Sequence, residues 1–186
     1  MKRFVTISVA LALVSMIILA VAFAQAKFTL RVNAGDTASY TDKAGNVWKG
    51  DKDYRKGGGY GFVGGDTIDR GESMKIEGTN DPKLYQTERY SMDKFIAEVP
   101  NGKYTVRLHF AETYDGIDTD GPRVFDIKIQ NQDVVKDLDV AKTAGKVQKA
   151  LVKEFKGVAV TNGILDITFV AKQQNPEING IEILGE

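Results

Sequence analysis

The stretch YTVRLHF, residues 104–110, alternates apolar and polar side chains from its first residue to its last. In a β-strand successive side chains point to opposite faces. One face would therefore carry the tyrosine, valine, leucine and phenylalanine, and the other face the threonine, arginine and histidine. Such alternation is typical of a half-buried strand. The stretch is predicted to be a strand whose apolar face lies in a core.

Short segments of the same kind lie on both sides of this stretch, separated by glycine, proline and asparagine. Only residues 140–147 could hold a short helix, with Asp139 as its N-cap. Asn162-Gly163, between two apolar runs, predicts a hairpin with a type I′ turn. Further strands are predicted over residues 28–33, 83–90, 95–99, 123–129, 134–135, 150–160, 164–169 and 178–184. The pattern predicts an all-β, jelly-roll-like β-sandwich with at most one or two short helices.

The first 26 residues have the composition of an export signal. Lys2 and Arg3 precede the almost wholly apolar run from Phe4 to Phe23, and Ala24-Gln25-Ala26 offers small residues where a signal peptidase would cut. Residues 1–26 are predicted to be a signal peptide, and the protein is predicted to be secreted, periplasmic or at the cell surface. The alternative is an uncleaved anchor, because about 20 apolar residues can span a bilayer; only then would a membrane be a partner.

Composition restricts the remaining residues, 27–186, to a single ordinary globular domain. Removing the first 26 of 186 residues leaves 23 basic and 25 acidic side chains. Such a near-neutral balance argues against nucleic acid and against an anionic membrane surface as partners. The chain contains no cysteine, which excludes disulfides, a thiol nucleophile and a cysteine metal site.

A glycine-rich run, GGGYGFVGG, occupies residues 57–65. Six glycines in nine residues predict a mobile or tightly folded loop. The glycines could let a ligand approach the backbone, and Tyr60 and Phe62 within the run favour that function over a plain flexible loop. The run is not a phosphate cradle, because neither a Gly-Lys-Ser/Thr sequence nor a strand-to-helix context accompanies it. No cofactor is predicted.

Two stretches each end a predicted strand with a tyrosine beside charged groups: LYQTERY, residues 84–90, and FAETYDG, residues 110–116. A tyrosine ring that covers the apolar face of a pyranose removes roughly 80 Å² from water, which is worth on the order of 2 kcal/mol. Its hydroxyl can also donate or accept a hydrogen bond. The two tyrosines are therefore predicted to form a site for a flat, hydroxyl-rich ligand. The alternative is that they pack at the edge of the sandwich.

The order of several motifs resembles that of the malectin domain and of the related bacterial carbohydrate-binding modules attached to glycoside hydrolases. The similarity covers essentially all of residues 27–186. The motifs are RVNAG (31–35), DPKLYQTERY (81–90), YTVRLHFAETY (104–114), RVFDI (123–127), residues 133–139 and INGIEI (178–183). The resemblance implies a jelly-roll-like β-sandwich with lectin activity toward glucose-containing oligosaccharides.

The resemblance also implies which residues touch the sugar. The family's sugar-contacting tyrosines correspond to Tyr60, Tyr90 and Tyr114 of this sequence. Where the family has an aromatic after the last of these, this chain has Asp115, and where the family has an aspartate before Asn-Pro, it has Gln174. The binding residues are predicted to be these five together with Glu88. The two departures bear on which sugar is bound rather than on sugar binding itself.

Other functions are also compatible with the sequence. A glycosidase needs two carboxylates across a cleft, but no motif fixes them here, and the lone His109 has no visible triad partner, so no enzyme activity is predicted. Asp115, Asp118 and Asp120 are spaced like calcium ligands but lack the glycine and glutamate of an EF-hand, so no metal is predicted and the loop is expected to be solvated.

The main alternative to carbohydrate binding is an exported module that presents the same loops to a protein or peptide. The expected partner is an oligosaccharide or polysaccharide, with a glycoside hydrolase or a cell-surface protein as a further partner.

Overall fold

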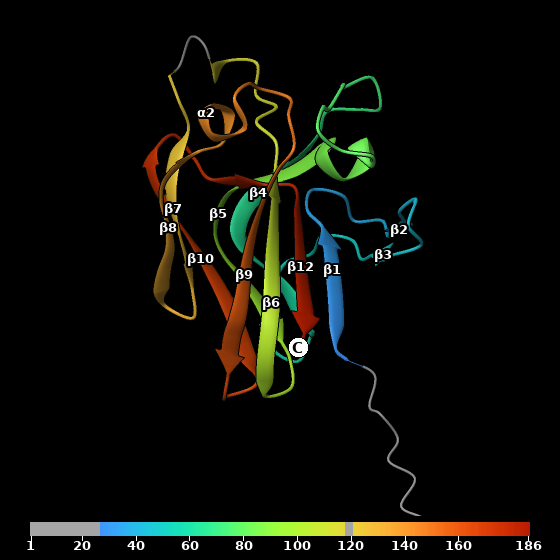
Figure 1. Cartoon of the computed structure of the whole chain (residues 1–186), viewed down its shortest axis with the longest axis vertical. Coiled ribbons are helices and arrows are strands. Elements are labelled where there is room, and N and C mark those ends of the chain that lie inside the picture. The colour runs from blue at the N-terminus through green and yellow to red at the C-terminus, as the bar shows by residue number, and fades with distance from the viewer. Residues whose placement is uncertain (1–26, 118–120) are drawn as a thin grey trace, which may run out of the picture.

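The computed structural model describes residues 27–117 and 121–186, which form two antiparallel sheets packed face to face (Figure 1). The predicted all-β sandwich is confirmed. The predicted signal peptide, residues 1–26, lies outside the described residues. Within the described part of the chain, no helix has the length and apolar character needed to cross a membrane.

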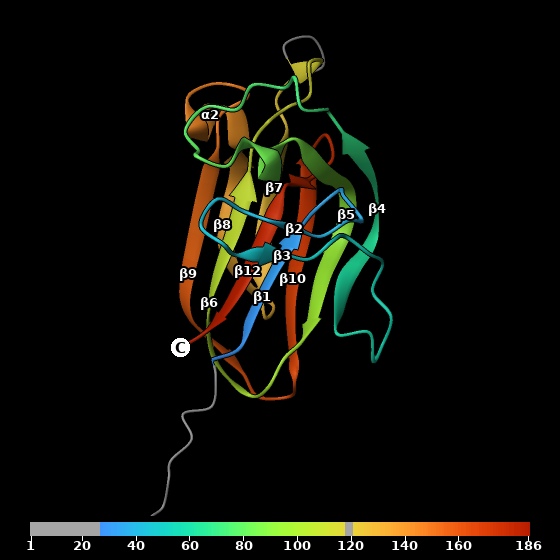
Figure 2. The same ribbon diagram turned by 90° about the vertical axis from the view of Figure 1, so that its right-hand side faces the viewer.

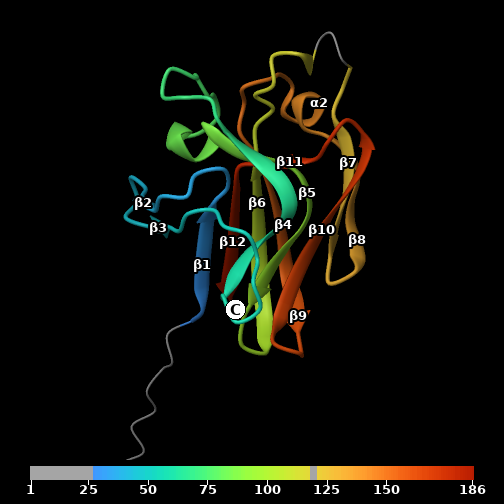
Figure 3. The same cartoon turned by 180° about the vertical axis from the view of Figure 1, so that it is seen from behind.

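One sheet has four strands and the other has six. The first, nearest the viewer in Figure 1, has the order β1 (Thr29–Asn33), β12 (Gly180–Gly185), β6 (Gly102–Phe110), β9 (Leu151–Val160). The second, seen from its own side in Figure 3, has the order β5 (Thr87–Glu98), β10 (Ile164–Gln173), β7 (Val124–Ile129), β8 (Gln132–Asp139), with β4 (Tyr60–Asp69) and β11 (Glu177–Ile178) also paired to β5. A small ribbon of β2 (Tyr40–Thr41) and β3 (Val47–Trp48) and the 3₁₀ helix η1 (Pro82–Tyr85) lie on one side of the sandwich (Figure 2).

The apolar faces of the strands meet in one core between the sheets. The residues of β6 that the alternation assigns to the core, Tyr104, Val106, Leu108 and Phe110, are all at most 2% exposed. They pack with the inward side chains of β5, β7, β10 and β12. The alternating pattern therefore identifies the buried face of β6 correctly.

The short helix α2 (Val140–Ala144) begins where the sequence predicts, after Asp139, but it ends at Ala144 and not at Val147. The carboxylate of Asp139 accepts a hydrogen bond from the backbone N–H of Lys142 at 2.9 Å, as an N-cap should. Gly145 closes the helix in the left-handed region, with φ of 90°.

The hairpin predicted at Asn162-Gly163 is wrong. These residues join β9 to β10, which lie in different sheets, so the turn crosses from one layer to the other. A two-residue hairpin lies instead between β7 and β8, where Gln130 and Asn131 both have positive φ (51° and 61°) and Ile129 pairs with Gln132. Positive φ at both central residues is the requirement of a type I′ turn.

The glycine-rich run is partly a strand, not a loop throughout. Residues 60–65 begin β4, which pairs with β5 from Tyr60 to Asp69 with a register shift between Val63 and Gly64. Glycine is required here because neighbouring backbone comes very close: a Cβ on Gly61 would lie 2.5 Å from the backbone nitrogen of Tyr54, and one on Gly65 would collide with the carbonyl oxygen of Tyr90. The strands predicted over 83–90 and 95–99 likewise differ, because η1 occupies the start and β5 then runs unbroken from Thr87 to Glu98.

Asn179 lies where the chain passes from β11 in one sheet to β12 in the other. Its side-chain oxygen accepts a hydrogen bond from the N–H of Ala111 at 2.5 Å, and its side-chain nitrogen donates to the carbonyl of Thr87 at 2.9 Å. Asn179 is fully buried. It therefore fixes the end of β6 against the start of β5, the two places from which the predicted tyrosine stretches emerge.

Replacing Asn179 with alanine is expected to lower the free energy of unfolding by about 1–3 kcal/mol, because two buried backbone groups lose their partners. Urea denaturation of the variant and the wild-type protein would measure the loss. An Asn162→Ala variant, changed at an exposed turn, is the matched control and should change the stability much less. Equal stability of Asn179→Ala and the wild type would contradict this role.

Candidate functional site

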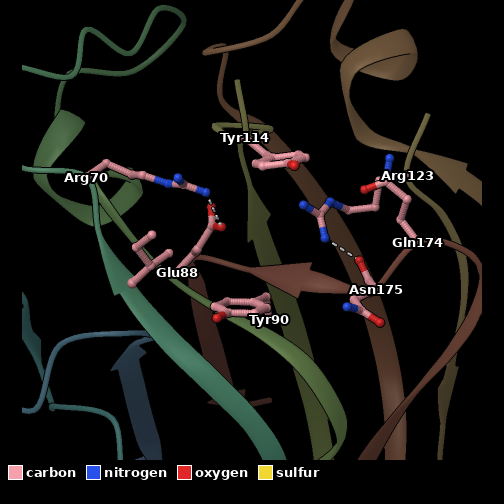
Figure 4. Close-up of a pocket in the computed structure, with 8 residues that line it drawn as sticks. Arg70, Glu88, Tyr90, Tyr114, Arg123, Gln174 and Asn175 are labelled. Carbon is pink, nitrogen blue, oxygen red and sulfur yellow. Dashed lines mark hydrogen bonds and ion pairs between the residues drawn. The ribbon is translucent and has the colours of Figure 1, made fainter. Parts of the chain in front are cut away.

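A cavity of about 290 Å³ opens where β5 begins and β6 ends. Figure 4 shows its lining in close-up. The eight residues that line it come from five separated segments: Ile68, Arg70, Glu88, Tyr90, Tyr114, Arg123, Gln174 and Asn175. We refer to it as the tyrosine cavity.

Tyr90 and Tyr114 lie on opposite sides of this cavity (Figure 4). Tyr90 is held in β5 between Asp66 of β4 and Glu177 of β11, which are its register partners on either side. Tyr114 follows β6, and its ring lies so close to Gly116 that a Cβ there would collide with it. Both tyrosines are half-buried, so each presents part of a ring to the cavity from a fixed backbone.

An ion pair holds one wall of the cavity. Arg70 donates through Nη2 to Oε1 of Glu88 at 2.9 Å and through Nε to the hydroxyl of Thr113 at 3.2 Å. The Thr113 hydroxyl in turn donates to Oε2 of Glu88 at 2.5 Å. Glu88 is 1% exposed, and both of its oxygens are engaged. Its role in this arrangement is to orient Arg70 at the edge of the cavity.

A second buried ion pair holds the opposite wall. Arg123 donates through Nε to Oε2 of Glu112 at 2.8 Å and through Nη1 to the carbonyl of Asn175. The other oxygen of Glu112 accepts from the N–H of Tyr114 at 3.0 Å. Burial opposes the charge of Arg123, but the hydrogen bond to Glu112 and its negative charge outweigh that effect, so the pKa of Arg123 is raised. This pair ties the backbone of Tyr114 to that of Asn175.

A third carboxyl lies buried close to these pairs. Glu177 is fully buried, and neither of its oxygens has a hydrogen-bond partner among the described residues. Burial, together with the negative charges of Glu88 and Glu112, raises its pKa well above the usual value, while Arg123 and Arg70 oppose the shift only in part. Glu177 faces the same side of the sheet as its register partner Tyr90. The charged form of Glu177 is therefore disfavoured in the folded protein.

The structure brings four of the six predicted site residues together and leaves two apart. Glu88, Tyr90, Tyr114 and Gln174 all line the tyrosine cavity. Asp115 follows Tyr114 but is exposed and does not line it. Gln174 has a φ of 55°, and its side-chain nitrogen donates to the carbonyl of Gly121.

Tyr60 is held at a different place from the one expected for a sugar-binding loop. It pairs with Ala97 near the far end of β5, whereas Tyr90 pairs with Asp66. Its hydroxyl donates to the carbonyl of Gly50 at 2.8 Å, and Lys52 lies over its ring. The contacts of Tyr60 are therefore those of a packed residue, and the structure does not bring it to the tyrosine cavity.

Sequence reasoning missed the arginines and Asn175 as members of the site. Arg123 carries a weak signal, because it directly precedes an alternating strand and follows a polar loop. Arg70 belongs to no motif. Its place beside Glu88 depends on the pairing of β4 with β5, in which Ile68 lies opposite Glu88. The sequence alone does not predict that register.

No group of three His, Cys, Asp or Glu side chains in residues 27–117 and 121–186 is arranged to hold a metal ion. The calcium alternative involved Asp118 and Asp120, which lie outside the described residues. His109 is buried, within hydrogen-bond distance of Tyr85 at 2.9 Å and of Glu182 at 3.1 Å. It is a satisfied structural histidine, away from the cavity lining.

Comparison with protein families gives one decisive match. The family model described as the malectin domain matches residues 28–183. The chain belongs to the malectin family. Malectin-B of Xenopus laevis is 32% identical to it over 148 residues, which is 70% of this chain and 52% of that protein, and human malectin is 32% identical over 137 residues, which is 64% and 46%. The chain thus spans about half the length of these relatives.

Solved structures give the same fold in larger proteins. The β-glucuronidase of Bacteroides uniformis matches with a TM-score of 0.76 and 26% identity over 86% of this chain and 18% of that enzyme. The plant receptor-like kinase FER matches with a TM-score of 0.68 and 23% identity over 86% of this chain and 42% of that one. The sandwich of this malectin-family chain therefore also occurs within an enzyme and within a receptor.

Proposed function

We propose that this malectin-family protein is a non-catalytic carbohydrate-binding module and that it binds glucose-containing oligosaccharides or polysaccharides in the tyrosine cavity. The observation that carries the proposal is the placement of Tyr90 and Tyr114 on opposite sides of a cavity whose other lining residues, apart from Ile68, are polar or charged. Two rings facing one space suit a pyranose, whose ring is flat and apolar on its faces and carries hydroxyls around its edge.

The physical chemistry of the cavity suits weak, geometry-dependent binding. Each tyrosine that covers a sugar face contributes on the order of 2 kcal/mol through apolar surface removed from water. The arginines, Gln174 and Asn175 supply directed polar groups at its walls. A hydroxyl of the wrong epimer would leave a polar group unpaired, and that loss exceeds the gain from a formed hydrogen bond.

The acidic groups at the cavity favour binding over hydrolysis. A glycosidase requires two carboxylates that flank the scissile bond. Of the described residues that line the cavity, only Glu88 is acidic, and Arg70 and Thr113 occupy both of its oxygens. A carboxylate held in this way is poorly placed to give or accept a proton.

Replacing Tyr114 or Tyr90 with alanine is expected to weaken binding of a gluco-oligosaccharide about 30-fold, which corresponds to the roughly 2 kcal/mol lost with one ring. A glycan array would find the ligand, and calorimetric titration would measure the change. Tyr54→Ala is the matched control, because Tyr54 hydrogen-bonds Glu98 near the opposite end of β5. Unchanged affinity in both cavity variants would refute the site.

The array also separates this proposal from a protein-binding role. FER, which shares the fold, is known in complex with the plant peptide RALF23 and LLG2. A folded protein that binds no glycan, but captures a protein through the loops around Tyr90 and Tyr114, would replace the carbohydrate proposal. The signal-like composition of residues 1–26 supports a partner outside the cytoplasm, at the cell surface, in the periplasm or in the medium.

A further inference from the structure

Hydrogen-bond donors and acceptors are unequally distributed around the tyrosine cavity. A guanidinium carries five N–H donors and no acceptor. Arg70 uses its Nε and one Nη2 hydrogen on Thr113 and Glu88, and Arg123 uses its Nε and one Nη1 hydrogen on Glu112 and Asn175. About three N–H groups therefore remain on each arginine, and both arginines line the cavity.

The charged acceptors nearby are already engaged. Both oxygens of Glu88 accept from Arg70 and Thr113, and both oxygens of Glu112 accept from Tyr114 and Arg123. Glu177 is buried beneath the surface and does not line the cavity. A ligand in the cavity therefore meets two arginines that each keep about three N–H groups, whereas every oxygen of Glu88 and Glu112 already accepts one hydrogen bond.

The charges that line the cavity are also unequal. Arg70 and Arg123 contribute two positive charges to the lining, and Glu88 contributes one negative charge, while Glu112 lies behind Arg123. The arginines extend from opposite sides toward the space between the two tyrosines (Figure 4). Arg123 is only 6% exposed, and a hydrogen bond to a group in such a poorly solvated place is stronger than one in water.

We infer that the tyrosine cavity selects an acidic sugar and that Arg70 and Arg123 bind the carboxylate of a uronic acid residue. A carboxylate is an acceptor only, with about four lone-pair sites that match the N–H groups of guanidinium pairs. A neutral hydroxymethyl group at the same position of the sugar ring offers only one acceptor oxygen. Its hydroxyl hydrogen also needs an acceptor of its own. This inference rests on the proposed carbohydrate binding and specifies its ligand class.

The test compares ligands that differ only at one carbon. Glucose, glucuronate and glucuronamide, each as the same methyl glycoside in both anomers, are titrated against the wild-type protein by calorimetry. Glucuronate is expected to bind at least about tenfold more tightly than the other two, because charge-assisted hydrogen bonds are roughly twice as strong as neutral ones. Raising the salt from 0.05 to about 0.5 M is expected to reduce that advantage.

The outcomes separate this inference from the function on which it rests. If glucose or glucuronamide binds as tightly as glucuronate, the acidic-sugar inference is overturned while carbohydrate binding stands. If no glycoside here and no glycan on the array binds, both proposals are overturned. Because these comparisons use only the wild-type protein, loss of folding cannot obscure them.

An arginine variant tests the assignment to side chains. In Arg70→Gln, the ratio of glucuronate affinity to glucose affinity is expected to fall at least about fivefold, because the amide retains a donor for Glu88 but not the charge. Arg107→Gln, on the outer face of β6 and 40% exposed, is the matched control and should keep the wild-type ratio. An unchanged ratio in Arg70→Gln would overturn the role of Arg70.

Discussion

Replacing Arg123 with methionine is expected to lower the free energy of unfolding by about 3–5 kcal/mol, the usual cost of removing one partner of a buried ion pair. Glu112, 1% exposed, would keep its charge and lose its 2.8 Å partner. The carbonyl of Asn175 would lose its donor in the same step. The loss would also release Tyr114 from Asn175, because Arg123 and Glu112 connect the two.

Two further variants make this prediction specific. Adding Glu112→Gln to Arg123→Met is expected to recover much of the lost stability, since no unpaired charge would then be buried. Lys146→Met breaks an ion pair with Glu77 whose side chains are 50% and 64% exposed, and it should cost less than about 1 kcal/mol. Urea denaturation measures all three. A loss below 1 kcal/mol in Arg123→Met would contradict the structural role of the pair.

Replacing Glu177 with glutamine is expected to stabilise the protein at neutral and alkaline pH. Folding raises the pKa of Glu177 because it is fully buried and close to Glu88 and Glu112. The native state therefore binds more protons than the unfolded state above the usual pKa of glutamate, and stability falls as the pH rises toward the folded pKa. Glutamine keeps the shape without the ionisation. The gain is expected to reach the cost of an unpaired buried charge, on the order of several kcal/mol.

The stability difference between Glu177→Gln and the wild type isolates this group. The groups that face Glu177 are Glu88, Glu112, Arg123 and Arg70, and they are present in both proteins. Denaturation between pH 4 and pH 9 should give nearly equal stabilities at the acidic end and a growing advantage for the variant as the pH rises. A difference that stays constant with pH would show that Glu177 does not carry the buried proton.

The strands could be predicted wherever burial on one face imposes an alternating pattern. Residues 104–110 and 123–129 show this most clearly, and β6 and β7 lie there. The hairpin prediction at Asn162-Gly163 was wrong because the turn preference of two residues does not indicate which sheet the next strand joins. The glycines from residue 61 onward were predicted as loop because sequence does not show how closely β4 would approach its neighbours.

The site was predictable where a residue belongs to a motif and obscure where it depends on pairing across the sheets. Tyr90 and Tyr114 each belong to a motif that the sequence shows, and Asn179 joins the sheets that bring them together. Arg70 and Arg123 reach the cavity through the register of β4 and through the ion pair with Glu112. Neither contact follows from local sequence, and these are the residues that give the cavity its charge.

The central claim, that a saccharide binds between Tyr90 and Tyr114, is tested most directly by protein NMR during titration with the best ligand of the array. The account predicts amide shifts concentrated at Glu88 to Tyr90, at Thr113 and Tyr114 and at Gln174 and Asn175, with the region of Tyr60 unchanged. Saturable binding with shifts centred on Tyr60 and no change around the tyrosine cavity would contradict it.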